Sequence, residues 1–173
     1  MSDVAPDRVA DVSEALARAG LRLAVAESCT GGLLAEWLTA RPGASRYFEA
    51  GLVTYSNRAK ASLLNVDPGT LAAEGAVSEA VALEMLAGAR TRTGAQAAVA
   101  ITGIAGPGGG TAEKPVGTVW IASGVGPETR VRRYRFDGDR ASVRTAAADA
   151  ALDLLWQLLM EAAGPDAGSD GEE

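Results

Sequence analysis

Helical and strand-like segments alternate along the chain, and this alternation constrains the fold more than any other feature of the sequence. Apolar residues three or four apart predict helices, and short apolar runs bounded by turn residues predict strands. The predicted helices span residues 7–19, 33–40, 57–64, 79–93 and 140–164, and Ser56, Ser78 and Asp139 are the predicted N-caps of the last three. The helix over 57–64 is predicted to end at residues 65–68, and one further helical turn can form over 70–74. The predicted strands span residues 21–26, 48–55, 95–101, 115–123 and 129–136. Such alternation is typical of an α/β fold, here a three-layer α/β/α sandwich.

The last two predicted strands are joined through Gly124, Gly126 and Pro127. So short a connection favours an antiparallel hairpin. The first three predicted strands alternate with helices, which favours parallel pairing among them. The sheet is therefore predicted to be mixed and mostly parallel.

The length of 173 residues and the apolar content of 47% fit one compact domain, which is predicted over residues 1–162. The last 13 residues contain five acidic residues and no basic one. The net charge of −6 therefore falls to about −1 for residues 1–160. The acidic segment over residues 163–173 is predicted to be a disordered tail.

The chain contains no histidine and one cysteine, Cys29. Ser-His-Asp and Cys-His mechanisms, a disulfide framework and a structural zinc site are therefore excluded within this chain. A hard cation such as Mg²⁺ held by carboxylates is the alternative left open, but no cluster of acidic residues in the sequence indicates such a site. No apolar run approaches the roughly 20 residues that span a bilayer, and the acidic N-terminus does not resemble a signal peptide. We expect a soluble, cytoplasmic protein with no membrane partner.

The turn over residues 27–32, Glu-Ser-Cys-Thr-Gly-Gly, lies between a predicted strand and a predicted helix. Unpaired N–H groups and the dipole at a helix start can stabilise an anion, including the oxyanion of a tetrahedral intermediate. Ser28 is the candidate nucleophile in this turn, although a plain helix cap is the alternative role for such a serine. Cys29 has no histidine to activate it, so a buried, unreactive thiol is expected.

Lys60 and Lys114 are the only lysines, whereas fourteen residues are arginine. A desolvated lysine can serve as a neutral base, but an arginine does not deprotonate at working pH. Lys60 lies one helical turn after Ser56, the predicted N-cap, so its amine can share a pocket with Tyr55. Lys60 is the candidate base and Tyr55 the candidate hydroxyl that relays or orients the proton. A solvated surface lysine is the alternative.

The loop over residues 102–110, Thr-Gly-Ile-Ala-Gly-Pro-Gly-Gly-Gly, offers many backbone N–H groups with few side chains in the way. Such a loop can contact a phosphate or a planar substrate closely. It is not a P-loop, because Glu113 and Pro115 flank Lys114 where the P-loop ending requires other residues. A merely flexible connection is the alternative.

Arginines cluster around the last predicted strand and the start of the last helix. They are Arg130, Arg132, Arg133, Arg135, Arg140 and Arg144. Most are expected to be solvated surface charges. Arg140 differs because it lies in the first turn of a helix beside Asp139, where the dipole and the guanidinium together could bind a phosphate.

Five motifs carry a resemblance to a known family. They are Ala-Glu-Ser-Cys-Thr-Gly-Gly over 26–32, Gly-Leu-Val-Thr-Tyr-Ser-Asn over 51–57 followed by Lys60, Gly-Ala-Val-Ser over 75–78, Thr-Gly-Ile-Ala-Gly-Pro over 102–107, and Lys-Pro-Val-Gly-Thr-Val over 114–119. In this order they resemble the C-terminal domain of the CinA family, the nicotinamide-nucleotide amidases. The resemblance covers about residues 7–160. Many family members carry an additional N-terminal domain, and because 173 residues leave no room for it, we expect a stand-alone amidase domain.

The resemblance implies that nicotinamide mononucleotide is hydrolysed to nicotinate mononucleotide and ammonia, a step in pyridine nucleotide salvage, without a metal or cofactor. It assigns Ser28 as nucleophile, Lys60 as base and Tyr55 as an assisting group. The amides of Thr30 and Gly31 are the candidates for the oxyanion hole. The resemblance implies a three-layer sandwich with a mixed sheet, and a homodimer. The residues expected to hold the nucleotide are Thr102, Gly103, Ile104, Ala105, Gly106 and Arg140.

Two other classes of function compete with the amidase. A non-catalytic, nucleotide-binding regulatory domain could keep the pocket after losing the chemistry, although the presence of Ser28, Tyr55 and Lys60 argues against it. A nucleic-acid partner is disfavoured because the folded part is nearly neutral and lacks a surface of basic and aromatic residues.

Overall fold

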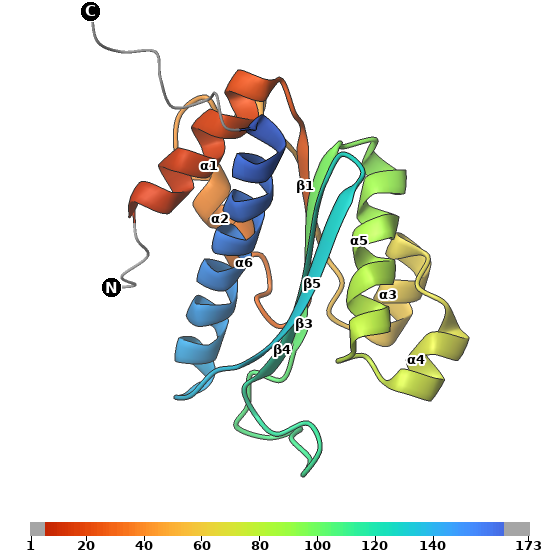
Figure 1. Ribbon diagram of the computed structural model, residues 1–173. Helices are drawn as coiled ribbons and strands as arrows, with labels where there is room; N and C mark the ends of the chain where they lie inside the picture. The colour runs from red at the N-terminus through yellow and green to blue at the C-terminus, as the bar shows by residue number, and fades with distance from the viewer. Residues whose placement is uncertain (1–5, 165–173) are drawn as a thin grey trace, which may run out of the picture.

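A five-stranded sheet lies between two layers of helices in the computed structural model, which describes residues 6–164 (Figure 1). The strands are β1 (Leu23–Glu27), β2 (Phe48–Val53), β3 (Ala97–Gly103), β4 (Thr118–Val125) and β5 (Glu128–Arg135). The helices are α1 (Pro6–Ala19), α2 (Leu33–Thr39), α3 (Asn57–Leu64), α4 (Pro68–Glu74), α5 (Glu79–Thr93) and α6 (Arg140–Ala163), with a short 3₁₀ turn over Ala44–Arg46. The predicted α/β/α sandwich is confirmed.

The strand order is β2-β1-β3-β4-β5. β1 pairs in parallel with β2 and β3, whereas β4 pairs antiparallel with both β3 and β5. The prediction of a mixed, mostly parallel sheet is therefore confirmed, since four of the five strands, all except β4, run in the same direction. The connection over residues 104–117 contains no helix that could return the chain to the opposite end of the sheet, so β4 runs back beside β3.

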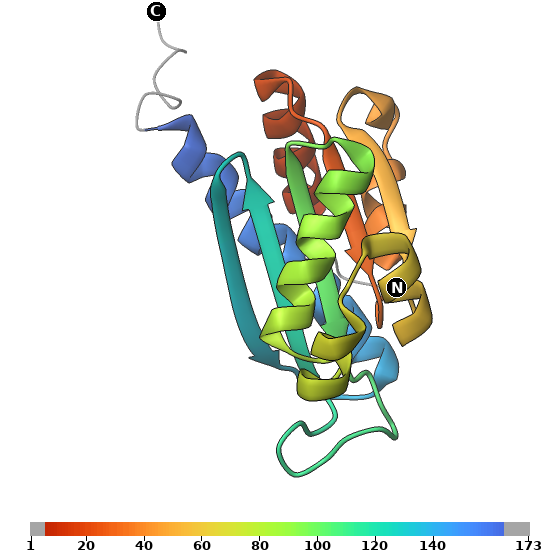
Figure 2. The same ribbon diagram turned by 90° about the vertical axis from the view of Figure 1, so that its right-hand side faces the viewer.

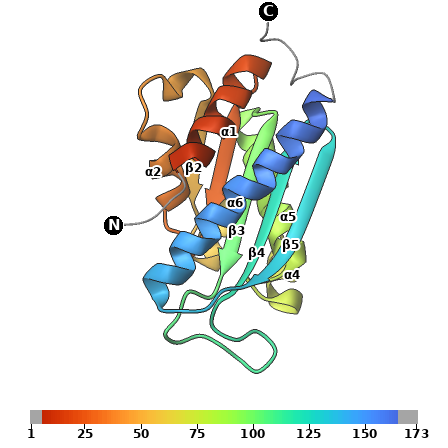
Figure 3. The same ribbon diagram turned by 60° about the vertical axis from the view of Figure 1, so that its left-hand side comes forward.

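Each face of the sheet has its own apolar core. α1, α2 and α6 cover one face, and α3, α4 and α5 cover the other (Figures 1 and 3). All five residues of β1 and the first six of β3 are buried, because helices cover both sides of these central strands. Alternate residues of β3 enter the two cores, Val99 one and Ala98 the other.

Gly88 brings α3 against α5. A Cβ at Gly88 would lie 1.9 Å from the Leu64 carbonyl oxygen, so only glycine permits this approach. The close packing fixes α3, which carries Lys60, against the rest of the domain. Ser56 begins α3 as predicted, since its side chain accepts a hydrogen bond from the Ala59 amide.

Some element boundaries differ from the prediction. Residues 65–68 were expected to be a break, with at most one helical turn over 70–74, but α4 begins at Pro68. The Asp67 side chain accepts a hydrogen bond from the Gly69 amide, and proline is well suited to the first helical position. β3 also continues to Gly103, two residues beyond the predicted strand, because Thr102 and Gly103 pair with Trp120 and Val119 of β4.

Segments that contain the sequence motifs lie at one end of the sheet. β1, β2 and β3 all end there, and the segments that follow them cover residues 28–32, 54–56 and 104–117. The carboxyl ends of parallel strands share an edge of the sheet, where α/β proteins commonly bind ligands. Figure 2 shows the 104–117 segment extending beyond this end, close to the start of α6. The tail predicted over 163–173 lies outside the described residues except for Ala163, the last residue of α6, and Gly164.

Candidate active site

Ser28 and Lys60 are in direct contact. The Lys60 Nζ atom lies 2.8 Å from Ser28 Oγ and 2.9 Å from the carbonyl oxygen of Thr54. Both side chains are buried, since Ser28 is 8% exposed and Lys60 is 1% exposed. The solvated-surface alternative for Lys60 is therefore wrong, and a hydroxyl and an amine share one desolvated site.

The ends of two strands and one helix position this pair. Ser28 directly follows β1, and its amide donates to the Ile101 carbonyl of the neighbouring β3. The Thr54 amide donates to the Glu27 carbonyl, which fixes the segment after β2 beside Ser28. Lys60 reaches both from α3, so three elements that are separate in sequence hold the pair at a defined distance.

Burial lowers the pKa of Lys60 below its ordinary value of 10.5, because the charged ammonium loses its hydration. No salt bridge to Lys60 is present within residues 6–164 that would restore the charged form. A lysine with a lowered pKa carries a free lone pair in a larger fraction of molecules near neutral pH. The arrangement can therefore remove the proton of Ser28 and return it to a leaving group.

Glu27 occupies the start of α2. Its two carboxylate oxygens accept hydrogen bonds from the amides of Leu34 and Ala35, at 3.0 and 3.1 Å, and the residue is fully buried. The expected anion site at this helix start is thus filled by the protein's own carboxylate. Stabilisation of an oxyanion beside Ser28 must come from the turn that precedes the helix.

In the turn over residues 28–32, the amides of Ser28 and Gly31 donate to carbonyl groups, whereas those of Cys29, Thr30 and Gly32 have no hydrogen-bond partner among residues 6–164. The Gly31 amide, one of the two candidates for an oxyanion hole, donates to the Ser28 carbonyl at 3.0 Å and so is engaged in the turn. The Thr30 amide, the other candidate, has no hydrogen-bond partner among residues 6–164. Thr30 is therefore the better candidate of the two.

Tyr55 lies apart from the Ser28–Lys60 contact. Its side chain is 58% exposed, and its hydroxyl accepts a hydrogen bond from Arg140 Nη2 at 2.5 Å. Arg140 Nη1 donates to the Gly106 carbonyl at 2.8 Å. The structure thus brings three predicted site residues, Tyr55, Gly106 and Arg140, together as a polar rim. It shows no hydrogen bond, among the described residues, from the Tyr55 hydroxyl to Ser28 or Lys60.

The other residues of the Gly-rich loop are used within the fold. The Thr102 hydroxyl donates to the Ala76 carbonyl at 2.7 Å, and Ala105 is buried. Ile104 exchanges backbone hydrogen bonds with Gly117 and Thr118. A Cβ at Gly103 would lie 2.6 Å from a methyl group of Val119, so glycine is required there for packing. These residues shape the base of the loop.

Cys29 is buried beside the turn, with 5% of its surface exposed. Burial is the largest of several influences that together raise the pKa of its thiol to about 11. A thiol that stays protonated is a poor nucleophile, which supports the expectation of an unreactive side chain.

Sequence reasoning missed three contributors to the site: the Glu27 carboxylate, the Thr54 carbonyl and the Arg144 side chain. Arg144 was grouped with the solvated arginines, but its Nε and Nη2 atoms donate to the carbonyls of Cys29 and Thr30. One signal was available, because Arg144 follows Arg140 by four residues and so shares its helix face. The roles of Glu27 and Thr54 depend on strand register and carried no such signal.

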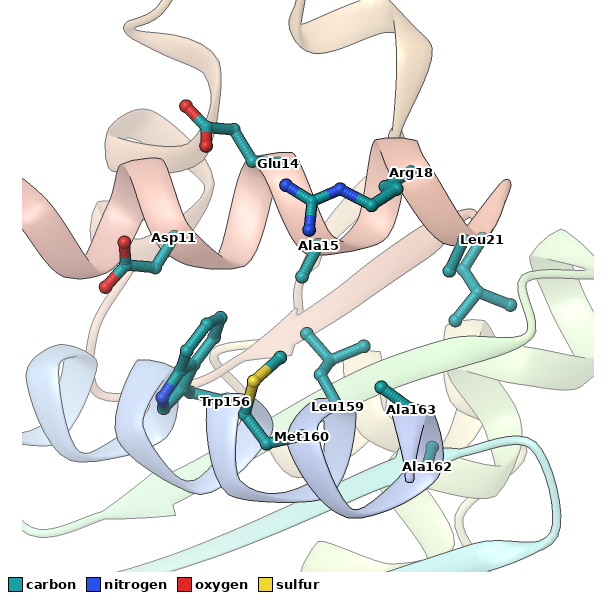
Figure 4. Close-up of a pocket in the computed structure, with 11 residues that line it drawn as sticks. Asp11, Glu14, Ala15, Arg18, Leu21, Trp156, Leu159, Met160, Ala162 and Ala163 are labelled. Carbon is teal, nitrogen blue, oxygen red and sulfur yellow. The ribbon is translucent and has the colours of Figure 1, made fainter. Parts of the chain in front are cut away.

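A hollow with a volume of about 540 Å³ lies between α1 and the C-terminal half of α6. Figure 4 shows Trp156 and Leu159 of α6 directed toward Ala15 of α1. Sixteen residues of helix separate Arg140 from Trp156, about 24 Å at 1.5 Å per residue. This groove is therefore remote from Ser28 and contributes nothing to the site.

Neither a metal site nor a membrane-spanning helix is found within residues 6–164. No group of three or more metal-ligating side chains lies close enough to hold an ion within residues 6–164. None of the described helices combines the length and the apolar character that crossing a membrane requires.

Comparison with known proteins agrees with the fold and the motifs. A family model, the CinA C-terminal domain, matches residues 7–159. A CinA-like protein of Mycolicibacterium paratuberculosis is 56% identical over 149 residues, which cover 83% of this chain and 34% of that protein. A CinA-like protein of Syntrophobacter fumaroxidans is 53% identical over 87% of this chain and 35% of its own length. The chain thus spans about a third of the length of these curated relatives.

Solved structures give the same result over nearly their whole length. The competence damage-inducible protein A (ComA) of Klebsiella pneumoniae superimposes with a TM-score of 0.86 at 42% identity, covering 89% of this chain and 96% of that one. The competence or damage-inducible protein of Enterobacter asburiae gives a TM-score of 0.87 at 37% identity, covering 91% and 99%. This chain belongs to the CinA family.

Proposed function

We propose that the protein is an amidohydrolase that converts nicotinamide mononucleotide to nicotinate mononucleotide and ammonia through an acyl-enzyme on Ser28. The observation that carries the proposal is the 2.8 Å contact between the buried Lys60 amine and the Ser28 hydroxyl. In a chain without histidine, this contact supplies the nucleophile and base that acyl transfer needs.

The first half of the reaction forms the acyl-enzyme. Lys60 Nζ takes the hydroxyl proton as Ser28 Oγ attacks the carboxamide carbon, which gives a tetrahedral oxyanion. The Thr30 amide is the candidate donor to that oxyanion. The Lys60 ammonium then protonates the amide nitrogen and the carbon–nitrogen bond breaks. Ammonia departs, and the nicotinoyl group of the nucleotide remains bound to Ser28 as an ester.

The second half regenerates the enzyme. Lys60 removes a proton from a water molecule that attacks the ester carbon, and then returns this proton to Ser28 Oγ as the carbon–oxygen bond to the enzyme breaks. The product is the pyridine carboxylate. One amine thus acts as base and acid in both steps, a role that requires its lowered pKa.

The polar rim supplies binding. Arg140 carries five N–H donors, and two of its nitrogens hold Gly106 and Tyr55, so further donors remain for a phosphate. Binding of the phosphate at the rim would hold the nucleotide in one orientation, with its carboxamide at the Ser28–Lys60 pair. Nicotinamide alone lacks this phosphate and is expected to be a far poorer substrate than the nucleotide.

The burial of Lys60 also weighs against the regulatory alternative. A buried amine without an ionic partner lowers the stability of the fold. A domain that had lost its catalytic activity would therefore be more stable with an apolar residue in place of Lys60. The assay of ammonia release that tests the amidase also tests the regulatory alternative, because binding without turnover would favour it.

The test follows ammonia release from nicotinamide mononucleotide. Ser28→Ala and Lys60→Arg are expected to lower kcat by at least about 10³-fold, because each removes a partner of the proton transfer. Ser62→Ala, at an exposed serine of α3, and Lys114→Arg, at the other lysine, are the matched controls and should keep wild-type activity. Tight binding of the nucleotide with no ammonia released by the wild type would overturn the proposal.

A further inference from the structure

Arg144 directs its guanidinium at the turn that carries Ser28. Its Nε atom donates to the Cys29 carbonyl at 3.1 Å, and its Nη2 atom donates to the Thr30 carbonyl at 2.8 Å. A Cβ at Gly31 would lie 3.4 Å from Nη2, so the turn packs directly against the guanidinium. Arg144 therefore holds two successive peptide groups from one side.

The geometry of the peptide bond gives this contact a consequence. In a trans peptide the carbonyl and the N–H point in opposite directions, and the cis peptide of the described chain lies elsewhere, before Pro107. When the Cys29 and Thr30 carbonyls face Arg144, the amides of Thr30 and Gly31 face away from it. These are the two amides that were the candidates for the oxyanion hole.

The two amides then differ in what they can do. The Gly31 amide donates a hydrogen bond to the Ser28 carbonyl and so stabilises the turn, whereas the Thr30 amide has no hydrogen-bond partner within residues 6–164. A positive charge on the carbonyl side also polarises the peptide group, which makes its N–H a stronger donor. A guanidinium in this place can therefore both orient the Thr30 N–H and strengthen it as a donor.

Within residues 6–164, no acidic side chain pairs with Arg144 to explain its position otherwise. The salt bridges of the described residues involve other arginines. The side chain is half-buried and makes both of its hydrogen bonds to the nucleophile turn. A residue that served only to attach α6 to the sheet would not need to orient two consecutive peptide planes.

We propose that Arg144 is a positioning residue that orients the Thr30 amide toward the oxyanion formed at Ser28. The inference rests on the proposed function, because it assigns a role in the same acyl transfer. It predicts that loss of the guanidinium affects the transition state and leaves ground-state binding of the nucleotide nearly unchanged.

The first test separates kcat from KM. Arg144→Met should lower kcat by about 10²-fold, the effect of removing one oxyanion donor, with KM changed little. Arg144→Lys, which can reach one carbonyl as a point charge, should fall between Met and wild type. Guanidinium ion added to Arg144→Ala should restore part of kcat, whereas it should not restore Lys60→Arg. Wild-type kcat in a folded Arg144→Met variant would overturn the inference.

A second test does not depend on the nucleotide. A fluorophosphonate probe reacts as Ser28 Oγ bonds to phosphorus, fluoride leaves and Lys60 takes the hydroxyl proton, and the phosphoryl oxygen then takes the oxyanion position. Arg144→Met should be labelled at Ser28 about 10-fold or more slowly than wild type, as followed by intact mass. Equal labelling rates would overturn the inference. If the wild type is labelled but releases no ammonia, only the choice of substrate in the proposed function fails.

Discussion

The two halves of the site differ in how they are built. The reactive half consists of Ser28 and Lys60, buried at the ends of central strands, whereas the rim consists of the exposed Tyr55 with Arg140 and the Gly106 carbonyl. Burial lowers the pKa of the base, and exposure lets a charged substrate group enter. Substitutions in the reactive half should therefore change kcat, and those in the rim should change KM.

α6 connects the two halves through residues on one face. Arg140 contacts the rim, and Arg144, one helical turn later, contacts the turn of the nucleophile. Two arginines of the same helix thus serve different halves. Comparing them tests the division more sharply than comparing unrelated side chains, because both substitutions disturb the same helix.

The largest effect is expected from Lys60→Met, which should lower kcat by about 10⁴-fold or more because no base remains. The same change should raise the free energy of unfolding. The folded-state pKa of Lys60 is lowered, so between that pKa and 10.5 the unfolded wild type binds a proton that the folded state does not. Wild-type stability therefore rises with pH across this window.

The advantage of the Met variant should consequently shrink as the pH rises from 7 toward 10. Urea unfolding at several pH values measures this difference in the free energy of unfolding. Lys114→Met is the control, because it replaces a lysine whose amine is not buried. A Met variant less stable than wild type at neutral pH would show that the hydrogen bonds of Lys60 outweigh the cost of burying it.

Arg140→Met tests the rim. Loss of the guanidinium should raise KM and lower kcat/KM for the nucleotide by about 10²-fold, with a smaller change in kcat, because a charge-assisted contact to phosphate is lost. Kinetics with nicotinamide, which lacks phosphate, provide the control and should be unaffected. A fall in kcat as large as that of Arg144→Met would remove the distinction between the two arginines.

The pH profile of wild-type kcat/KM tests the reactive half without a substitution. Because burial lowers the pKa of Lys60, the acid limb should have its midpoint below 10.5 and fall tenfold per pH unit below that midpoint. Tyr55→Phe should leave the midpoint unchanged, since the Tyr55 hydroxyl contacts Arg140. A displaced midpoint in Tyr55→Phe would return this hydroxyl to the proton relay that the sequence predicted.

The fold could be predicted well because its signals are local. Polar caps such as Ser56, Ser78 and Asp139 accept the hydrogen bonds expected of them, and the apolar runs became the central strands. The reversed direction of β4 agrees with the Gly-rich, non-helical pattern of the loop that precedes it. The order of the strands could not be predicted, because it depends on contacts between segments that are far apart in the sequence.

The sequence identified residues of the candidate site more readily than the contacts that these residues make. Ser28 and Lys60 stood out because their chemistry has few substitutes in a chain without histidine. The Tyr55 hydroxyl contacts Arg140 in place of the expected Lys60, because the Tyr55 side chain is exposed after the end of β2, and its part in the proton transfer stays a prediction. Glu27 could not be foreseen at the start of α2, because the tight Gly31-Gly32 turn that brings α2 back over β1 is a three-dimensional feature.

Tyr55→Phe should have a smaller effect than Arg140→Met. Without the hydroxyl, Arg140 keeps its contact with the Gly106 carbonyl but loses one of its two supports, so KM should rise about two- to fivefold with kcat nearly unchanged. Steady-state kinetics of the two single variants and the double variant measure the coupling. Additive effects would show that Tyr55 does not act through Arg140.

The smallest effect is expected at Cys29, although it adjoins the nucleophile. Its thiol, with a pKa of about 11, is ionised in only about one molecule in a thousand at pH 8, and it packs beneath the loop beside Gly103. Cys29→Ala should keep kcat within about twofold and cost about 1 kcal/mol of stability for the lost sulfur. Iodoacetamide should leave the native wild type active while modifying the unfolded protein. Inactivation that keeps pace with alkylation of the native protein would mean that the turn opens to solvent, and the buried half of the site would then be less rigid than its contacts indicate.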